Sequence, residues 1–208
     1  NLETSSKNCS VALSSEGKLI SNFDLEDDKY RHSELLTSTI KDILVQNNIS
    51  AKDLSAVAIG IGPGSFTGLR IGFSVAKGLC YPHKINLIGI SSLKILANSI
   101  KADSGDIVSM INDKGNFYYL STFEDKLNEV GNPILEQVDP NFIKKYIKDG
   151  STIVVNSEGS FNYISTTIND QIKLINKSIS SINMIDLSYE SFLEKRFEDL
   201  AYCEPLYI

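Results

Sequence analysis

The sequence predicts an α/β protein whose mixed sheets carry helices on their faces. Three observations lead to this class. Short strand-like runs alternate with segments of helical periodicity, a glycine-rich turn joins a buried strand to a helix, and the succession hairpin, helix, strand, helix recurs in the second half. With 208 residues, 42% of them hydrophobic, the chain can bury a core in one large domain or two lobes. We expect lobes at 1–103 and 104–208, and we expect the segment from about 188 to 208 to return to the first lobe.

The first lobe is expected to open with a hairpin. The runs Ser10–Leu13 and Lys18–Phe23 flank the turn-forming residues 14–17. A helix is predicted over Ser33–Asn47, with Ser33 as its N-cap and an apolar face formed by Leu36, Ile40, Ile43 and Leu44. The rest of the lobe alternates between strand and helix: Val57–Gly60, Thr67–Cys80, Asn86–Ile90 and Ser91–Lys101.

The second lobe is expected to repeat this succession. Four runs have strand character: Ile107–Ile111, Phe117–Phe123, Thr152–Val155 and Lys173–Ile175. Asp139-Pro140 predicts a helix start, because aspartate caps a helix and proline suits its first turn. A capping box at Ser191 and Glu194 predicts a last helix with Leu193, Phe197 and Leu200 on its core face. Apart from the strand-like run Lys173–Ile175, residues 157–188 are weakly patterned and receive no assignment.

The distribution of charge argues against a nucleic-acid-binding protein. Residues 1–104 hold 11 basic and 10 acidic side chains, whereas residues 105–208 hold 9 and 16. No basic cluster is denser than Lys144-Lys145, so the chain alone is expected to bind nucleic acid poorly.

The ends of the sequence and its cysteines point to a compartment. No apolar run has the length of a membrane span, and the first residues are no signal peptide. Three scattered cysteines indicate buried, reduced thiols, so we expect a cytoplasmic protein. The sequence does not begin with Met, so we expect the native start to be missing and Asn1 to lie partway into the first strand.

The glycine-rich segment 60–72 is the most informative stretch. It follows a strand and precedes a helix, where backbone N–H groups and the helix dipole favour an anion. The spacing nevertheless fits no Walker loop, no dinucleotide fingerprint and no serine-hydrolase elbow. Two interpretations stay open: a nucleotide cradle, or a tight turn that lets the helix pack closely.

The following helix carries a stripe of mostly small side chains, Gly68, Gly72, Val75 and Ala76 with Leu79. Three glycines in one helix (68, 72 and 78) cost about 1 kcal/mol each relative to alanine, so a packing reason is expected. Part of this stripe must meet the helix's own sheet. Whether the rest contacts a partner protein stays open at this point.

Catalytic residues are scarce. His32 and His83 are the only histidines, and no set of ligands has the spacing of a zinc site. Glu3 and Asp113 are carboxylates without an evident partner, so a general acid and base pair is not supported. His32 suits a helix cap or an interface better than a general base for Ser33 or Ser65. The residues alone therefore predict no catalytic site and no metal site.

Several motifs nevertheless resemble one family. The segment Gly62-Pro63-Gly64-Ser65-Phe66-Thr67-Gly68, continuing through Arg70 and Gly72 to Leu79, closely resembles the signature of the TsaB (YeaZ) family. The resemblance extends to residues 2–5, 31–36, 88–93 and 204–208, and it is strong over about residues 1–100.

The resemblance implies the actin/Hsp70-like ATPase fold (ASKHA, ribonuclease H-like), with two βββαβα lobes. It also implies a required, non-catalytic role beside TsaD, the enzyme that transfers threonylcarbamoyl to the adenosine next to the anticodon of tRNA, with the ATPase TsaE as a further partner. A homodimer is expected in isolation, and tRNA is expected only through the complex. No cofactor is firmly implied, although ATP or ADP at an interface of the complex would fit.

The resemblance also implies roles for individual residues. Ser92 and Leu96 stand at the metal-ligand positions of the paralogue TsaD, and Glu3 replaces a common aspartate in a loop that resembles the phosphate loop of actin-type proteins. The partner interface is expected on the helices Ser33–Asn47 and Thr67–Cys80, through His32, Leu35, Leu36, Ile40, Ile43, Gly68, Gly72, Val75, Ala76 and Leu79. The alternatives are an independent nucleotide-dependent enzyme or peptidase that uses Gly60–Gly68, and a tRNA-binding module acting alone.

Overall fold

Two five-stranded sheets of the same strand order form the framework of the chain. In this computed structural model, the described residues are 1–26, 32–100, 105–124 and 127–208. They form two units, Asn1–Ser92 with Ile179–Tyr207, and Leu93–Ser178 with Ile208. The helix end expected at Lys101 and the lobe boundary expected at 103/104 lie outside the described residues.

The first sheet has the strand order β3-β2-β1-β4-β5. Strand β1 is antiparallel to β2 and parallel to β4, and β4 is parallel to β5. The prediction that the first hairpin and the run Val57–Gly60 share one sheet is confirmed. The bounds of these strands are β1 (Leu2–Glu3), β2 (Asn8–Ser15), β3 (Lys18–Glu26), β4 (Ala56–Gly62) and β5 (Asn86–Ser91).

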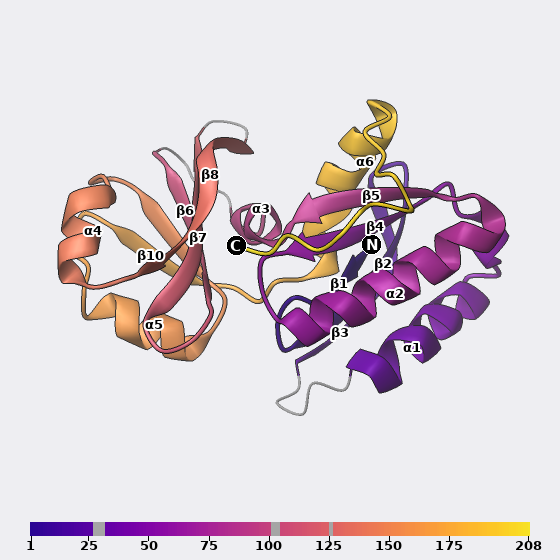
Figure 1. Cartoon of the computed structure of the whole chain (residues 1–208), viewed down its shortest axis with the longest axis horizontal. Helices are drawn as coiled ribbons and strands as arrows, with labels where there is room; N and C mark the ends of the chain where they lie inside the picture. The colour runs from indigo at the N-terminus through magenta and orange to yellow at the C-terminus, as the bar shows by residue number, and fades with distance from the viewer. Residues whose placement is uncertain (27–31, 101–104, 125–126) are drawn as a thin grey trace. The chain divides into compact units, whose positions relative to one another are not determined.

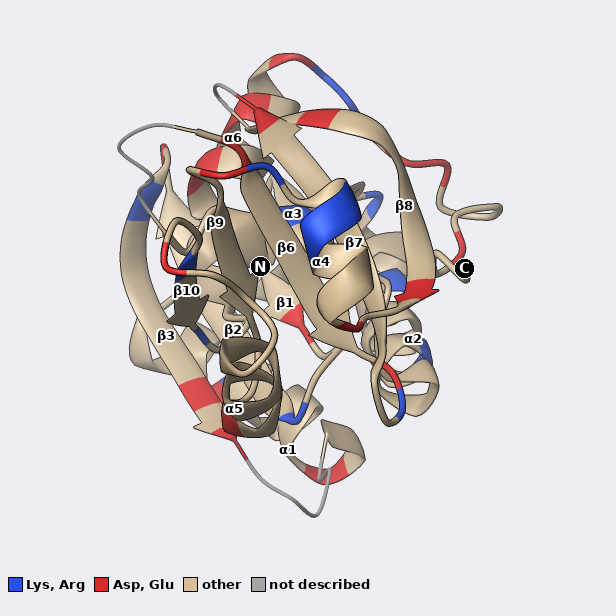
Figure 2. Ribbon diagram, turned by 90° about the vertical axis from the view of Figure 1, so that its left-hand side faces the viewer, with Lys and Arg blue, Asp and Glu red and all other residues tan. Residues whose placement is uncertain are grey.

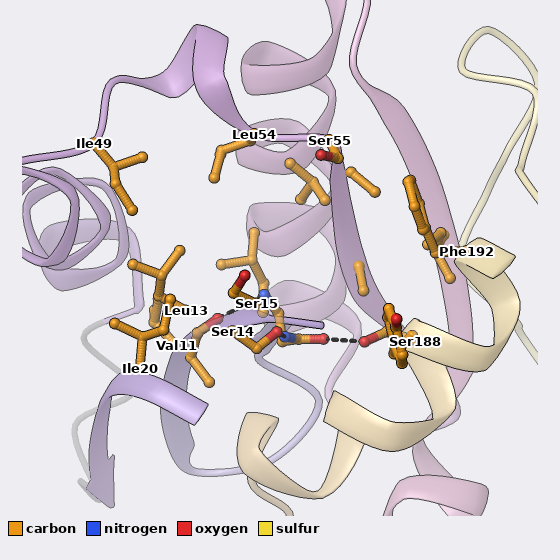
Figure 3. A pocket seen from close by; sticks show the side chains of 18 of the residues that line it. Val11, Leu13, Ser14, Ser15, Ile20, Ile49, Leu54, Ser55, Ser188 and Phe192 are labelled. Atoms are coloured by element: carbon orange, nitrogen blue, oxygen red, sulfur yellow. Dashed lines mark hydrogen bonds between the residues drawn. The ribbon is translucent and has the colours of Figure 1, made fainter. Parts of the chain in front are cut away.

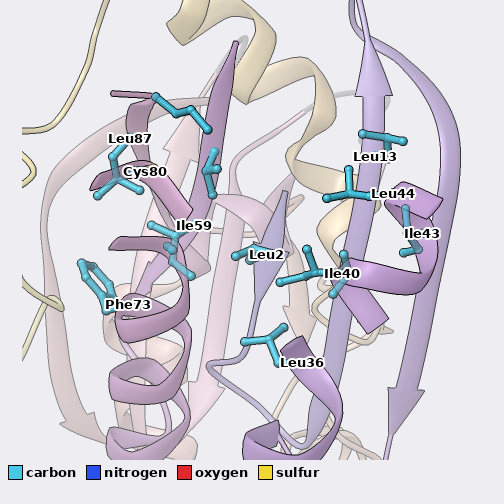
Figure 4. Close-up of a cluster of buried hydrophobic side chains, with 14 of the residues drawn as sticks. Leu2, Leu13, Leu36, Ile40, Ile43, Leu44, Ile59, Phe73, Cys80 and Leu87 are labelled. Atoms are coloured by element: carbon cyan, nitrogen blue, oxygen red, sulfur yellow. The ribbon is translucent and has the colours of Figure 1, made fainter. Parts of the chain in front are cut away.

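Helices α1 (His32–Gln46) and α2 (Phe66–His83) lie side by side on this sheet and contact each other (Figure 1). Their inner faces bury apolar side chains against the strands, as Leu36, Ile40 and Phe73 do around Leu2 and Ile59 (Figure 4). Removing these side chains from water is the main stabilising contribution to the unit. The short helix η1 (Ala51–Asp53) precedes β4, and η3 (Ser181–Met184) with α6 (Ile185–Leu193) also contacts the sheet.

The second unit repeats the topology with the order β10-β9-β6-β7-β8. Its strands are β6 (Ile107–Asn112), β7 (Phe117–Glu124), β8 (Asn128–Gln137), β9 (Thr152–Val155) and β10 (Lys173–Asn176), and its helices are α4 (Pro140–Tyr146) and α5 (Glu158–Ser165). The core lies around Met110, Tyr118 and Ile153. Basic residues gather on α4, whereas acidic residues stand near both ends of β8 (Figure 2).

Three sequence predictions are wrong in detail, and one strand was missed. Ser33 lies inside α1 and not at its N-cap, and the helix predicted from Ser91 is the short α3 (Ser92–Ala97). Ser191 lies near the end of α6, which begins at Ile185, so the capping box starts no helix. Strand β8 was not predicted. The N-cap Asp139 is confirmed, because its side chain accepts the N–H of Phe142 over 2.7 Å.

Among the described residues, no helix is both long and apolar enough to cross a membrane.

Candidate functional site

The glycine-rich signature forms the loop that leaves β4 and starts α2. Ser65 is the N-cap of α2, where its hydroxyl accepts the N–H of Gly68 over 3.2 Å. The N–H of Ser65 in turn donates to the carbonyl of Ser5 over 2.7 Å, which ties this loop to the loop after β1. Ser65 therefore holds two loops together, and its hydroxyl caps a helix.

Glu3 lies at the centre of this connection. Its side chain is fully buried, and its two carboxylate oxygens have different donors. Oε1 accepts the N–H of Ser5 over 2.6 Å, and Oε2 accepts the hydroxyl of Ser92 over 3.2 Å. Burial raises the pKa of Glu3 above its usual 4.5, although the hydrogen bonds from Ser5 and Ser92 oppose this effect. Through Ser92, Glu3 thus has a partner that its sequence neighbours do not indicate.

The hydrogen-bonded path continues into the signature loop. Ser92 donates to Glu3 and also accepts the N–H of Gly62 over 3.2 Å. Gly62 has a φ of +98°, which a residue with a side chain rarely adopts. Gly60 has no room for a side chain, because a Cβ there would stand 2.0 Å from Oε2 of Glu3. Gly60, inside β4, thus serves the close approach of Glu3, and Gly62 serves the turn at the end of β4.

The small-residue stripe of α2 faces its own sheet. A Cβ at Gly68 would stand 2.0 Å from the carbonyl oxygen of Thr4, and one at Gly72 would stand 2.4 Å from the Thr4 hydroxyl oxygen. That hydroxyl donates to the carbonyl of Gly68 over 2.8 Å. Ala76 is fully buried in the same core. Placing Gly68, Gly72 and Ala76 at a partner interface was therefore wrong, because Thr4, on the loop after β1, and Ile59 of β4 lie against the two glycines, and Ala76 is buried in the core.

Four residues predicted for the interface on α1 are also buried in the chain's own core. They are His32, Leu36, Ile40 and Ile43. The Nε2 atom of His32 lies 2.9 Å from the carbonyl oxygen of Ser6, and burial lowers the pKa of the ring. His32 is thus a buried residue bound to the loop after β1.

Three residues predicted for the partner interface lie on the outer side of the layer formed by α1 and α2. Leu35, Val75 and Leu79 are half-buried and pack on the edge of the core. Gly78 lies next to them and is exposed, and a Cβ added there would meet nothing within 4 Å. This glycine has no packing reason within its own unit.

An aromatic and cationic cluster stands at the start of α2. The Arg70 guanidinium lies 3.8 Å from the centre of the Phe66 ring, and the Tyr207 ring is 5.3 Å from Phe66. Phe66 and Tyr207 are about half exposed, so the signature loop presents aromatic surface to solvent. Leu206, beside Tyr207, donates its N–H to Ile61 over 2.8 Å, which holds the last residues of this unit along the end of β4.

Ser92 and Leu96 stand at the positions that the resemblance matches to the metal ligands of the paralogue. Both side chains are fully buried. Across the described ranges, no group of three or more His, Cys, Asp or Glu side chains could hold a metal ion.

The fold places the chain in a known class. A solved structure titled "YeaZ from Pseudomonas aeruginosa" is similar with a TM-score of 0.85 and 20% identity, over 100% of this chain and 97% of that chain. An inorganic polyphosphate/ATP-glucomannokinase from Arthrobacter sp. strain KM is similar with a TM-score of 0.55 and 7% identity, over 93% and 97%. With its two sheets of equal order, the chain has the actin/Hsp70-like ATPase fold.

Sequence similarity gives the family. A family model described as "TsaD: tRNA N6-adenosine threonylcarbamoyltransferase" matches residues 26–190. The tRNA threonylcarbamoyladenosine biosynthesis protein TsaB of Escherichia coli K12 is 36% identical over 104 residues, which are 50% of this chain and 44% of that protein. TsaB of Bacillus subtilis is 29% identical over 140 residues, 67% of this chain and 58% of that protein. The chain belongs to the TsaB (YeaZ) branch of this family. It spans about half the length of the curated relatives it matches.

Proposed function

We propose that this chain is the non-catalytic partner of a TsaD-type threonylcarbamoyltransferase in the biosynthesis of threonylcarbamoyladenosine in tRNA. The names of its relatives support the pathway. The match to the TsaD family model supports a common ancestry with the transferase. The remaining support comes from the outer face of α1 and α2 and from the way the chain uses its polar residues.

The observation that carries the proposal is the exposed Gly78. A glycine inside a helix costs about 1 kcal/mol relative to alanine, and nothing within 4 Å of a Cβ at Gly78 requires it. A partner whose backbone or helix approaches α2 closely would require it. The half-buried Leu35, Val75 and Leu79 beside it supply apolar area for such a contact. The proposed interface is therefore the outer face of α1 and α2, defined by Leu35, Val75, Gly78 and Leu79.

The non-catalytic role is supported by how this chain uses its polar residues. Ser92, at one metal-ligand position of the resemblance, is engaged by Glu3 and Gly62. Leu96, at the other, has no atom that could bind a metal. The Ser65 hydroxyl caps α2, and His32 binds the carbonyl of Ser6.

Further partners follow from the same proposal. TsaE would join the complex, and tRNA would be bound through the complex rather than by this acidic chain alone. ATP or ADP, if bound, would lie at an interface of the complex. Without TsaD, the same outer face of α1 and α2 would pair two copies of the chain.

The test is to measure binding of the TsaD from the same organism to this chain and to Gly78→Arg. The substitution places a long charged side chain in the interface without touching the chain's own core, so the dissociation constant should rise at least tenfold. Gly159→Arg is the matched control, because Gly159 is also a helical glycine with open space around its Cβ, in α5 of the other unit. Modification of tRNA by TsaD should require the chain and should fall with Gly78→Arg only.

Equal affinity of the Gly78→Arg variant and the unaltered chain for TsaD would contradict the proposed interface. The alternative, an independent enzyme, predicts something else. ATP turnover or peptide cleavage by the isolated chain, abolished by Ser65→Ala, would favour a nucleotide-dependent enzyme or peptidase.

A further inference from the structure

Opposite charges are separated on the surface of the second unit. Residues 105–178 hold 7 basic and 10 acidic side chains, and three of the basic ones lie within 144–148. Lys144 and Lys145 belong to the last turn of α4, and Lys148 follows its C-cap, Ile147. Acidic residues stand near both ends of β8 instead (Figure 2). The end of α4 is therefore a positive patch on an otherwise mainly acidic surface.

The two lysines of α4 are available to bind an anion. Both side chains are exposed. Across the described ranges neither amine forms an ion pair, whereas Lys148 binds Asp106 over 2.8 Å. Because the C-terminal end of a helix dipole favours cations, these charges stand there without a cost to the fold. The patch thus offers two unpaired positive charges and a third that is shared with Asp106.

A tyrosine ring lies on the same patch. Tyr146 is 59% exposed, and its ring centre is 4.8 Å from Nζ of Lys145. The ring of Phe142, which is half-buried against the core of the unit, stands 4.9 Å from the ring of Tyr146. Phe142 thus holds the Tyr146 ring against the unit while more than half of that side chain stays in solvent. The patch combines positive charge with a supported aromatic ring.

Lysines beside an exposed aromatic ring fit RNA better than a protein partner. Lysine amines bind phosphate groups as point charges, and an aromatic ring stacks on an unpaired base. Protein interfaces, in contrast, are depleted in lysine. The first unit has a mainly apolar cavity of about 570 Å³, with Leu13, Leu54 and Phe192 in its lining (Figure 3). The described residues that line this cavity include no Lys or Arg, so it does not suit a polyanion.

We propose that the end of α4 binds RNA, with Lys144 and Lys145 on phosphate groups and Tyr146 against an unpaired base. This inference rests on the proposed function, in which the RNA is the tRNA that TsaD modifies. Two or three phosphate contacts give weak binding, so the patch adds to the affinity that the rest of the complex supplies. The acidic groups elsewhere on the unit repel the phosphate backbone, so contact at α4 also orients the tRNA.

The first test measures fluorescence anisotropy of a labelled, unmodified tRNA transcript with the isolated chain at low salt. The double variant Lys144→Ala/Lys145→Ala should bind about tenfold more weakly, and the slope of log Kd against log salt should fall by about 1–2, because two phosphate contacts are lost. Tyr146→Ala should weaken binding about threefold at an unchanged slope, because it removes stacking and no charge. The control, Lys18→Ala/Lys52→Ala, removes two exposed lysines of the first unit and should change neither quantity.

The second test measures tRNA modification by TsaD together with this chain. Lys144→Ala/Lys145→Ala should raise the KM for tRNA about fivefold, while kcat and the dissociation constant for TsaD stay unchanged. An unchanged KM together with unchanged or undetectable binding of tRNA by the isolated chain would overturn the proposal. Weaker binding of TsaD or TsaE, with an unchanged KM for tRNA, would also overturn it and show that α4 contacts a protein. Failure of the proposed function has a different result, because TsaD would then modify tRNA without this chain, and the anisotropy alone would decide.

Discussion

Ser92 and Glu3 form a buried hydrogen bond, in which the serine hydroxyl donates to Oε2 of the carboxyl group over 3.2 Å. The same hydroxyl accepts the N–H of Gly62, so the end of β1 and the signature loop are joined through one side chain. Ser92 is one of the positions at which the resemblance placed a metal ligand of the paralogue. In this chain the position serves an internal hydrogen bond, and Gly60 of β4 makes room for the Glu3 carboxyl group.

Replacing Ser92 with alanine should therefore destabilise the fold. Ser92→Ala leaves the N–H of Gly62 and Oε2 of Glu3 without this buried partner, so the free energy of unfolding should fall by about 1–3 kcal/mol. Ser38→Ala is the control, because Ser38 is exposed on α1 and should change stability by less than about 0.5 kcal/mol. Urea denaturation followed by circular dichroism gives both values. Equal values for the two variants would show that the network contributes nothing.

Two glycine-to-alanine changes should have opposite signs. Gly60→Ala places a methyl group against the Glu3 carboxyl and should lower the free energy of unfolding by about 1–3 kcal/mol. Gly78→Ala adds a methyl group in open space on α2 and should raise it by about 0.5–1 kcal/mol, because alanine favours the helix. Thermal unfolding of the two variants checks the signs. A stabilised Gly60→Ala variant would mean that Glu3 can move away at no cost.

The pH dependence of stability should carry the signature of Glu3. Burial raises the pKa of Glu3 in the folded chain above the 4.5 of the unfolded chain, so the folded chain binds this proton more tightly. The free energy of unfolding should therefore fall as the pH rises from about 4.5 through the folded-state pKa. The difference between the unaltered chain and Glu3→Gln isolates this contribution from those of other groups. Carbon NMR of the Glu3 carboxyl should give a midpoint above 4.5, and a midpoint below it would contradict the assignment.

Sequence patterns predicted most of the fold because they report local chemistry. The strand Thr152–Val155 and the cap at Asp139 rest on neighbouring residues, and the structure has both. The turn expected at 14–17 is also present, but it is confined to Glu16-Gly17 because Ser14 and Ser15 belong to β2. Strand β8 escaped prediction because it is an edge strand with mostly exposed side chains and contains Gly131 and Pro133. The start of α6 escaped because Met184, its N-cap, makes no side-chain cap hydrogen bond.

The candidate site was harder to predict because its contacts join distant parts of the chain. The signature loop was recognised as special, but nothing in the sequence pairs Glu3 with Ser92, which are 89 positions apart. The stripe of small residues on α2 was also ambiguous, because small side chains permit close approach from either side. The structure shows that the close approach is on the inner side of α2, where Thr4 of the loop after β1 lies against Gly68 and Gly72.

The three cysteines should react slowly with alkylating reagents in the folded chain. Desolvation raises the pKa of Cys9, Cys80 and Cys203 to about 11 each, so about one thiol in a thousand is ionised at pH 8. Cys203 is half-buried while the other two are buried, so iodoacetamide should label Cys203 first. Mass spectrometry of labelled peptides over time gives the order. Labelling of Cys9 or Cys80 before Cys203 would contradict the burial described for them.

Two neighbouring leucines of α1 should separate folding from association. Leu36 is fully buried in the core, so Leu36→Ala should lower the free energy of unfolding by about 2–5 kcal/mol.

Leu35 is half-buried on the proposed outer face, so Leu35→Arg should leave the fold intact and weaken pairing with TsaD and between two copies of the chain. Analytical ultracentrifugation of the isolated chain measures the second effect. We expect a concentration-dependent dimer for the unaltered chain and a monomer for Leu35→Arg, with Lys41→Ala, an exposed change on the same helix, as the control. A folded Leu35→Arg variant that dimerises as the unaltered chain does would remove the outer face of α1 and α2 as the pairing surface.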